Sequence, residues 1–167
     1  MNSFHRIAAI GMVLSLSLAT AGCASHAAVT AQNERAAIET QVHALLTAYQ
    51  ADDQNAALKL VDSGQFSVYG SDISEFVQTT AGLRQMMSDD FKLWHSAKFG
   101  PVKDLDIRIG HDLATAFFNI PFSVGGRPAV MVRMTTVWRK VNGVWLLTQS
   151  SNTVPTTHSS ARELLHR

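Results

Sequence analysis

The chain has 167 residues, of which 46% are hydrophobic and 16% charged, with four prolines and a single cysteine. This composition is typical of one globular domain, and one cysteine excludes an internal disulfide and disfavours a cysteine-based metal cluster. The 14 basic residues are nearly balanced by 13 acidic ones and are not clustered in a run. Neither a nucleic-acid partner nor polybasic attachment to anionic lipid is therefore supported.

The first 22 residues have the pattern of a secretory signal peptide. His5 and Arg6 form a short positive start, and the apolar stretch 7–21 contains no charge. That stretch is shorter than the ~20 apolar residues that a membrane-spanning helix needs. Residues 1–22 are therefore expected to direct export, and the mature chain is expected on the periplasmic side of a bacterial-type cell envelope.

Cys23 stands directly after Ala21-Gly22, at the end of the apolar stretch. This arrangement resembles the lipobox of bacterial lipoproteins, in which the cysteine becomes the lipid-bearing first residue of the mature chain. The resemblance implies lipidation of Cys23 and an outer-membrane anchor, with the small, polar segment 23–32 as a tether. The alternative is ordinary cleavage after Ala21 or Ala27, which would leave a soluble periplasmic protein.

Helical periodicity marks three segments after the tether. A long helix is expected from Asn33, because one apolar stripe runs through Ile38, Val42, Leu45, Leu46 and Tyr49. A short second helix is expected after residues 52–53 and before Ser63-Gly64. Thr79 or Thr80 is expected to cap a third helix, whose apolar residues are core by default: Leu83, Met86, Met87, Phe91 and Trp94.

A period of two predicts strands in the rest of the chain. Residues 65–70 alternate between apolar and polar, and four further alternating segments follow Gly100-Pro101. Asn142-Gly143 predicts a tight hairpin between the last two, because both turn residues must accept positive φ. The four late segments are 105–109, 113–122, 129–141 and 144–152, and a short helix is possible near 161–165.

The predicted order is therefore helix, helix, strand, helix and then a meander of four strands. Helices gathered early and strands gathered late indicate an α+β fold with an antiparallel sheet covered on one face. We expect the sheet to curve around the long N-terminal helix and to leave a cone-shaped hollow between sheet and helices.

Two passages of the chain resemble the SnoaL-like branch of the nuclear transport factor 2-like superfamily, whose layout is also called cystatin-like. That branch carries an Arg-x-Thr strand, a short basic stretch, an Asp/Asn-Gly turn and a tryptophan; the matching residues are Arg133, Thr135, Arg139, Lys140, Asn142, Gly143 and Trp145. It also carries a Gly-(Thr/Ser)-Asp and a glutamate before the third helix; the matching residues are Gly70, Ser71, Asp72, Glu75 and Gly82. The resemblance assigns residues 33–155 to the domain and 156–167 to a C-terminal tail.

The resemblance implies a pocket inside the cone. Members of the superfamily use it to isomerise, cyclise, dehydrate or hydrolyse small molecules, or simply to bind a ligand or a partner, so the fold alone does not decide between these functions. The chain departs from the branch at its closing His-x-Ser-x-Pro, because Ser151 stands at the histidine and Thr153 at the serine.

Candidate catalytic residues lie on the loop before the third helix. Asp72 or Glu75 would serve as a carboxylate base with a raised pKa, and Tyr69 on the preceding strand would supply a hydrogen-bond donor. The alternative is that both acids organise the loop, Asp72 through an Asx turn.

Candidate ligand-binding residues lie mainly on the late strands. Arg133 would bind a carboxylate or another anion if its strand face lines the hollow, with further contacts from Thr135, Gln149, Ser151, Asn119 and Trp94. If this face is the outer one, the same residues would pack against a second subunit. Arg133 would otherwise form a structural salt bridge to an acid such as Asp106.

Metal and cofactor motifs are missing from the sequence. His95 and His111 are not spaced with other ligands in a metal-binding pattern, and there is no G-x-G-x-x-G, P-loop or G-x-S-x-G. We therefore expect no metal and no cofactor.

Three functions remain as hypotheses. The first is an envelope domain that binds a small hydrophobic or carboxylated molecule without catalysis and forms a homodimer through its sheet. The second is a cofactor-independent isomerase, cyclase or hydrolase of the ketosteroid-isomerase-like type that uses a pocket carboxylate. The third is an envelope protein-interaction module.

Overall fold

The computed structural model describes residues 17–155, with side chains from residue 29 onward. The chain divides into two compact units, Met1–Asn33 and Glu34–Arg167, and the sheet belongs to the second together with the helical residues that cover it. Most of the predicted signal peptide and the possible helix near 161–165 lie outside the described residues. Within those residues, no helix combines the length and the hydropathy needed to cross a membrane.

Helix α1 spans Ser17–Gln50 and therefore begins well before the predicted start at Asn33. Periodicity could not find this start because the apolar stripe does not extend upstream. The segment before Asn33 is rich in alanine, the residue with the highest helix propensity, so it forms helix without an apolar stripe. The predicted tether, residues 23–32, is helical along its backbone.

The stripe of α1 packs into the core as expected. Ile38, Val42 and Leu46 are buried against the sheet, and Leu45 and Tyr49 are half-buried. Asp52 follows the helix with φ of 54°, a left-handed conformation that aspartate and asparagine tolerate better than most residues.

Both shorter helices begin at a side-chain cap, and the cap predicted at Thr79 or Thr80 is confirmed at Thr79. The side chain of Asp53 accepts a hydrogen bond from the Ala56 amide at 2.9 Å and begins α2 (Gln54–Lys59). The hydroxyl of Thr79 accepts one from the Gly82 amide at 3.1 Å and begins α3 (Thr80–Leu93). Helix α3 buries Leu83 and Met87.

Seven strands form one curved sheet. Their order across the sheet is β2-β1-β7-β6-β5-β3, and β4 also pairs with β5. The short strands β2 and β3 were not predicted, because two or three residues carry no readable alternation. The strand bounds are β1 Ser67–Tyr69, β2 Phe76–Val77, β3 Ala97–Phe99, β4 Lys103–Ile109, β5 Leu113–Val124, β6 Val130–Val141 and β7 Val144–Thr153.

The meander of β4, β5, β6 and β7 is antiparallel, neighbour to neighbour, as predicted. Asn142 and Gly143 have φ of 50° and 83°, as a tight hairpin between β6 and β7 requires. The pair β1–β7 is parallel, so the sheet is not antiparallel throughout. No hairpin connects these two strands, and their relative direction is therefore not fixed by a local turn.

A β-bulge interrupts the pairing of β6 with β7. Val137 pairs with Gln149 and Trp138 pairs with Leu147, so Thr148 is an extra residue in β7. The Thr148 hydroxyl donates a hydrogen bond to the Gln65 carbonyl at 2.7 Å. Because side chains alternate along a strand, one extra residue exchanges the two faces beyond this point.

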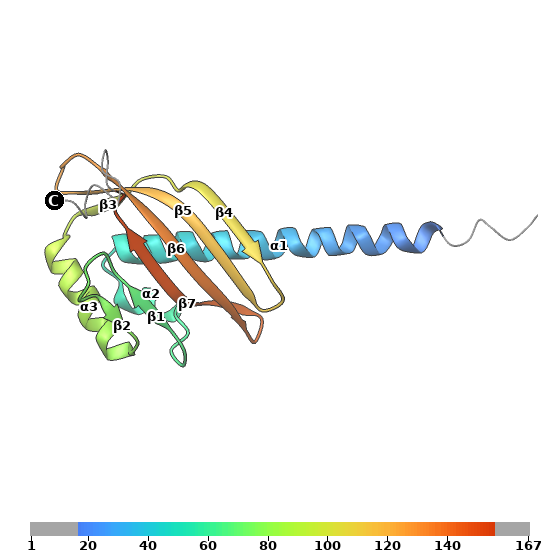
Figure 1. Cartoon of the computed structure of the whole chain (residues 1–167), viewed down its shortest axis with the longest axis horizontal. Coiled ribbons are helices and arrows are strands. Elements are labelled where there is room, and N and C mark those ends of the chain that lie inside the picture. Colours follow the sequence, from blue (N-terminus) through green and yellow to red (C-terminus); the bar gives the residue numbers. More distant parts are fainter. Residues whose placement is uncertain (1–16, 156–167) are drawn as a thin grey trace, which may run out of the picture. The chain divides into compact units, whose positions relative to one another are not determined.

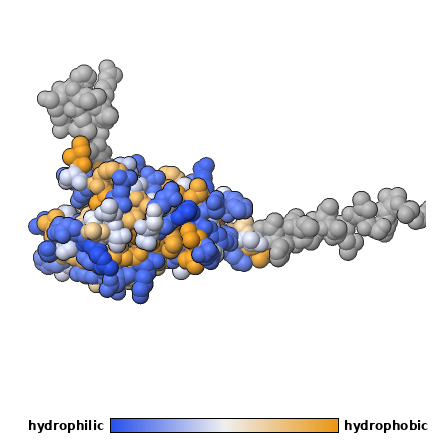
Figure 2. Space-filling model, turned by 90° about the horizontal axis from the view of Figure 1, so that it is seen from below, coloured by the Kyte–Doolittle hydropathy of each residue, from blue (hydrophilic) through white to orange (hydrophobic). Residues whose placement is uncertain are grey.

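The two faces of the sheet have different surroundings. Alternate residues of β5 and β6 are buried against the helices, among them Ala116, Phe118, Ile120, Thr136 and Trp138; this is the inner face. Figure 1 shows the second half of α1 running across one face of the sheet, with α3 near one end of it. On the surface shown in Figure 2, hydrophobic side chains form separate patches among hydrophilic ones.

Helix α1 is tied to the β6–β7 hairpin by polar contacts. The carboxylate of Glu34 accepts hydrogen bonds from the Lys140 ammonium at 2.5 Å and from the Trp145 indole N–H at 2.7 Å. The hydrogen bond from Lys140, and then that from Trp145, lower the pKa of Glu34. The Gln41 amide adds a hydrogen bond to the Trp145 carbonyl at 2.7 Å.

Candidate functional site

A cavity of about 440 Å³ lies between the inner face of the sheet and helices α1 and α3. This volume is within the range of small-molecule pockets. Most of the wall is apolar, and its apolar lining includes Leu45, Leu46, Val68, Leu83, Met86, Met87, Val130, Val132, Met134 and Leu147. The cavity is where the cone-shaped hollow was expected.

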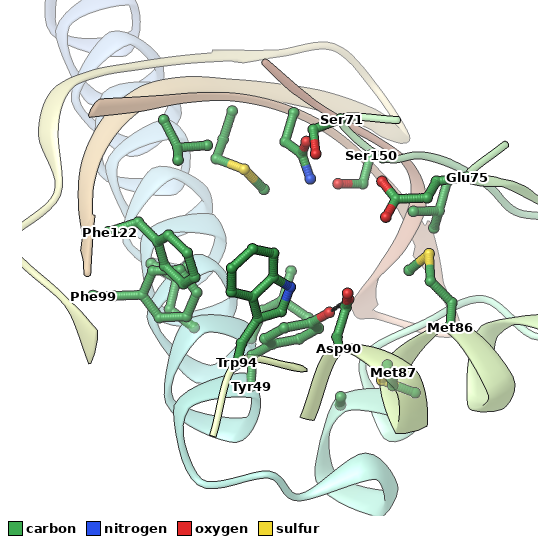
Figure 3. Close-up of a pocket in the computed structure, with 18 of the residues that line it drawn as sticks. Tyr49, Ser71, Glu75, Met86, Met87, Asp90, Trp94, Phe99, Phe122 and Ser150 are labelled. Atoms are coloured by element: carbon green, nitrogen blue, oxygen red, sulfur yellow. Dashed lines mark hydrogen bonds between the residues drawn. The ribbon is translucent and has the colours of Figure 1, made fainter. Parts of the chain in front are cut away.

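Four aromatic side chains gather at one side of the cavity (Figure 3). The ring of Trp94 meets that of Phe122 edge to face, with 5.8 Å between centroids. Phe99 lies 5.4 Å from Phe122 and 6.3 Å from Tyr49 by the same measure. Trp94, at the end of α3, is 36% exposed and lines the cavity, so it belongs to the pocket rather than only to the core.

Asp90 places a carboxyl group beside these rings. It lies on α3, half-buried, and accepts a hydrogen bond from the hydroxyl of Tyr49 on α1. Burial raises the pKa of Asp90, and a hydrogen bond from Trp94 opposes this shift only in part. The carboxyl therefore keeps its proton to a higher pH than an exposed aspartate does.

The opposite side of the cavity is polar. Figure 3 shows Ser71, Glu75 and Ser150 across the space from Phe99 and Phe122. The carboxylate of Glu75 accepts a hydrogen bond from the Asp72 amide at 3.0 Å. Gly70 allows this tight loop, because a Cβ at that position would collide with the Glu75 side chain.

The loop acids have different positions. Glu75 lines the cavity, whereas Asp72 is exposed and outside the lining. Asp72 accepts hydrogen bonds from the Ser74 amide at 2.8 Å and the Ser74 hydroxyl at 2.6 Å, and these lower its pKa. This is the Asx turn of the alternative interpretation, so the assignment of Asp72 as a pocket base is wrong.

Tyr69 was expected to face the pocket, but it points to the outer face. Its neighbour Val68 is buried and lines the cavity, so alternation directs Tyr69 away from it. Tyr69 instead stacks on Phe76, with 4.6 Å between ring centroids. It cannot donate a hydrogen bond to a ligand in this cavity.

Arg133 and Thr135 also lie outside the cavity lining, on the outer face. The inner residues of the same strand are Val132, Met134 and Thr136. Asn119 pairs with Arg133 in the sheet and shares that outer face. The prediction that these residues line the pocket is therefore wrong.

The predicted bridge between Arg133 and Asp106 is wrong as well. Asp106 pairs with Arg108 at 3.1 Å. The Arg133 guanidinium contacts the Asn119 amide oxygen at 3.5 Å, and the Asn119 amide nitrogen donates to Asp104 at 2.8 Å.

Simple alternation along β7 would place Gln149 and Ser151 on the same face as Trp145 and Leu147. The bulge at Thr148 breaks that grouping, so Ser150 and Asn152 line the cavity in their place. Ser151 pairs with Thr135 and shares the outer face with it. The strand position at which the SnoaL-like branch carries a histidine therefore does not face this cavity.

Asp90 was not among the candidates predicted from sequence, and Tyr49 was predicted only as part of the apolar stripe of the first helix. A usable indication existed, because Asp90 follows Met86 by four residues and precedes Trp94 by four. It is thus an acid within the apolar stripe of a helix, which is unusual unless the acid has a partner or a function.

A metal centre finds no support in the part of the chain that the structure describes. No three histidine, cysteine, aspartate or glutamate side chains converge there in a way that would hold an ion. The chemistry available to the cavity is that of the half-buried Asp90 with its partner Tyr49, of Glu75 and the serines at the polar side, and of a large apolar wall.

Comparison with known proteins identifies the fold. No protein-family model matches the sequence, and no curated protein matches it closely enough to count as a relative. Among solved structures, a nuclear transport factor 2-like protein of unknown function from Pseudomonas putida has a TM-score of 0.68 at 13% identity, over 78% of this chain and 91% of its own.

Two further structures agree with it. A protein of unknown function with a cystatin-like fold from Nostoc punctiforme has a TM-score of 0.65 at 15% identity, over 74% of this chain and 92% of its own. A hexachlorocyclohexane dehydrochlorinase from Novosphingobium barchaimii has a TM-score of 0.66 at 11% identity, over 80% of this chain and 94% of its own. The chain therefore has the predicted nuclear transport factor 2-like, cystatin-like fold.

Proposed function

We propose that this nuclear transport factor 2-like domain binds a small, mostly apolar molecule in its cavity, with Asp90 as the main polar contact. The observation that carries the proposal is a half-buried carboxyl group beside aromatic rings in a mostly apolar cavity of about 440 Å³. Pockets for small molecules combine a large apolar wall with a few convergent polar groups in this way.

The polar groups of the cavity do not favour a carboxylated ligand. Arg133, the residue expected to bind an anion, lies on the outer face of the sheet. The described lining contains two acids, Asp90 and Glu75, and one basic residue, the exposed Arg127. Of the two ligand classes considered from sequence, the hydrophobic one is therefore retained.

The proposal is tested by filling the cavity. Val132→Phe adds a ring to the inner face of β6, and Val137→Phe adds the same ring to the outer face of the same strand as a matched control. The full chain is titrated with the neutral fluorescent probe N-phenyl-1-naphthylamine. We expect Val132→Phe to weaken binding at least about tenfold and Val137→Phe to leave it unchanged.

Absence of binding to the wild-type chain would contradict the proposal. Equal affinity in both variants would do so too, because the probe would then be bound elsewhere. Circular dichroism of each variant confirms that the fold is retained.

A second candidate function is proton transfer by Asp90. A carboxyl group with a raised pKa in an apolar site is suited to general acid–base chemistry near neutral pH. Asp90 with Tyr49 replaces the pair first considered, Asp72 or Glu75 with Tyr69. In the simplest reaction, Asp90 takes a proton from a carbon next to a ligand carbonyl and returns it to a second carbon, so that a double bond moves and no atom is gained or lost.

This reaction is tested with small cyclic β,γ-unsaturated ketones, whose conjugated products absorb in the ultraviolet. We expect Asp90→Asn to lower the rate at least about a hundredfold, because the proton acceptor is lost. Asp89→Asn, on the exposed side of the same helix, should retain the wild-type rate. A wild-type rate no faster than that in buffer would reject the candidate for these substrates.

Export and lipid anchoring through Cys23 form a further part of the proposal. They are supported by the uncharged stretch 7–21 and by the small residues before the cysteine. Cells that express the full chain are grown with a clickable fatty acid, and Cys23→Ala should lose the label. A labelled Cys23→Ala variant would contradict lipidation, and an unlabelled wild-type chain in the periplasm would favour the soluble alternative.

We also propose that the outer face of the sheet packs against a second copy of the chain. The face carries exposed aromatic residues, of which Phe117 is 43%, Tyr69 44% and Phe76 49% exposed. Exposed apolar groups on one sheet face are typical of interaction surfaces. The interaction-module hypothesis would use the same face with a different partner.

A further inference from the structure

The charges of the cavity are unequal in sign and in burial. Asp90 is half-buried within the wall, and Glu75 is half-buried at the polar side. Arg127, in the loop between β5 and β6, is exposed to solvent, which screens its charge. A charged group of a ligand deep in the cavity would therefore interact mainly with acids.

Asp90 also retains capacity for another hydrogen bond. Its Oδ2 atom accepts the hydroxyl proton of Tyr49. A carboxylate has two oxygens and about four acceptor positions, so a donor from the ligand can be added beside Tyr49 and Trp94. Both of these neighbours are themselves hydrogen-bond donors, and a positively charged ligand would favour the ionised form of Asp90, which burial disfavours in the unliganded chain.

Two aromatic residues contact the same carboxyl group. Tyr49 and Trp94 both contact Asp90, and Phe122 lies 5.8 Å from Trp94 between ring centroids. A cation that is hydrogen-bonded to Asp90 would thus be within reach of the Trp94 ring. Cations are attracted to the faces of aromatic rings within about 6 Å, most strongly to tryptophan.

We propose that the cavity selects molecules with a protonated amine on an apolar body, and that the ammonium group binds between Asp90 and Trp94. This inference rests on the proposed ligand-binding function and specifies its ligand class. An ammonium group provides the buried carboxylate with an opposite charge and a charge-assisted hydrogen bond. A carboxylate ligand would meet two like charges, and an alcohol would form the hydrogen bond without the charge.

The test uses three probes with one apolar body: 1-naphthalenemethanamine, 1-naphthalenemethanol and 1-naphthaleneacetic acid. Their affinities for the full chain are measured by isothermal titration calorimetry at pH 7. We expect the amine to bind at least about tenfold more tightly than the alcohol, and the acid to bind more weakly than either.

Variants assign the preference to its residues. Asp90→Asn should reduce the amine affinity at least about tenfold and leave the alcohol affinity within about threefold. Trp94→Leu should reduce the ratio of amine to alcohol affinity by severalfold, on the order of a single cation–π contact. Asp89→Asn is the matched control and should change neither affinity.

Each other outcome has a definite meaning. Equal binding of the three probes, or an amine preference that survives in Asp90→Asn, would overturn the inference and leave the proposed function intact. Failure of all three to bind would overturn the inference, and it would overturn the proposed function only if N-phenyl-1-naphthylamine also fails to bind. If Asp90→Asn does not fold, a full amine preference in Trp94→Leu would still exclude the proposed position between Asp90 and Trp94.

Discussion

Asp90 couples the cavity to pH. Burial raises the pKa of its carboxyl group, so the folded chain holds this proton to a higher pH than the unfolded chain does. Stability from this group is therefore complete below the usual aspartate pKa and is lost as the pH rises through the raised value. Ionisation of Asp90 destabilises the unliganded fold.

Asp90→Asn should abolish the loss of stability that ionisation of Asp90 causes as the pH rises. Relative to the wild-type chain, the free energy of unfolding of the variant is expected to rise as the pH increases from about 4 through the raised pKa. Urea denaturation at several pH values between 4 and 7 measures the difference. Asp89→Asn should not show this gain, because hydrogen bonding from Gln85 lowers the pKa of Asp89 and gives the opposite sign.

At the residue scale, the sequence identified the polar loop but not the buried acid. Glu75 and Trp94 lie in the cavity lining, and their roles in binding remain predictions. Asp72 resembled a candidate base because its surroundings are similar in sequence to a known family, whereas its actual partner is Ser74. The burial of Asp90 follows from the packing of α3 against α1. Neither helix propensity nor residue spacing predicts how closely these two helices pack.

At the scale of elements, the contact of Glu34 with the β6–β7 hairpin is a second contact that makes stability depend on pH. Hydrogen bonds from Lys140 and Trp145 lower the pKa of Glu34, so its contribution is present above the usual glutamate pKa and is lost as the pH falls through the lowered value. The contact joins residues more than 100 positions apart in the chain.

Glu34→Gln should weaken the attachment of α1 to the hairpin. We expect about 1 kcal/mol lower free energy of unfolding at pH 7, because the charge-assisted hydrogen bond is lost. The deficit should shrink as the pH falls through the lowered pKa of Glu34, because the wild-type carboxylate then loses its charge as well. Urea denaturation measures both values, and Glu39→Gln, an exposed site on the same helix, should match the wild-type chain at each pH.

Most elements were predictable because each carries a local indication. The stripe of α1, the caps Asp53 and Thr79 and the turn at Asn142-Gly143 all operate within a few residues. The parallel pairing of β1 with β7 and the bulge at Thr148 depend on residues about 80 positions apart. Such partners cannot be found by following one segment at a time.

At the scale of the whole molecule, the outer face of the sheet is expected to determine the oligomeric state. Phe117→Asp places a charge among the exposed aromatic residues of that face. We expect the wild-type chain to be a dimer in size-exclusion chromatography with light scattering, and the variant to be a monomer with an unchanged melting temperature.

The control is Ile73→Asp, which replaces a fully exposed hydrophobic side chain in the loop between β1 and β2. That variant should remain dimeric. A monomeric wild-type chain at micromolar concentration would reject the dimer.

The layout of the whole domain was predictable, but the direction of its faces was not. Large apolar residues occupy both sides of the late strands; Phe117 lies on the outer face and Phe118 on the inner one. Composition therefore could not decide whether Arg133 lines the pocket. The helices pack on the face opposite Arg133, and this places Arg133 on the outer face. The bulge places Gln149 and Ser151 on the outer face as well.

The additional residue in β7 makes the strand tolerant of one particular deletion. If Thr148 were removed, Leu147 and Ser150 would still point inward and Gln149 outward, because the shortened strand would pair with β6 in plain alternation. Only the local bend and the hydrogen bond to Gln65 would disappear. Length variation among natural relatives or designed versions of this strand should therefore be concentrated at this position, because loss of one residue here leaves the cavity-lining residues of β7 pointing inward.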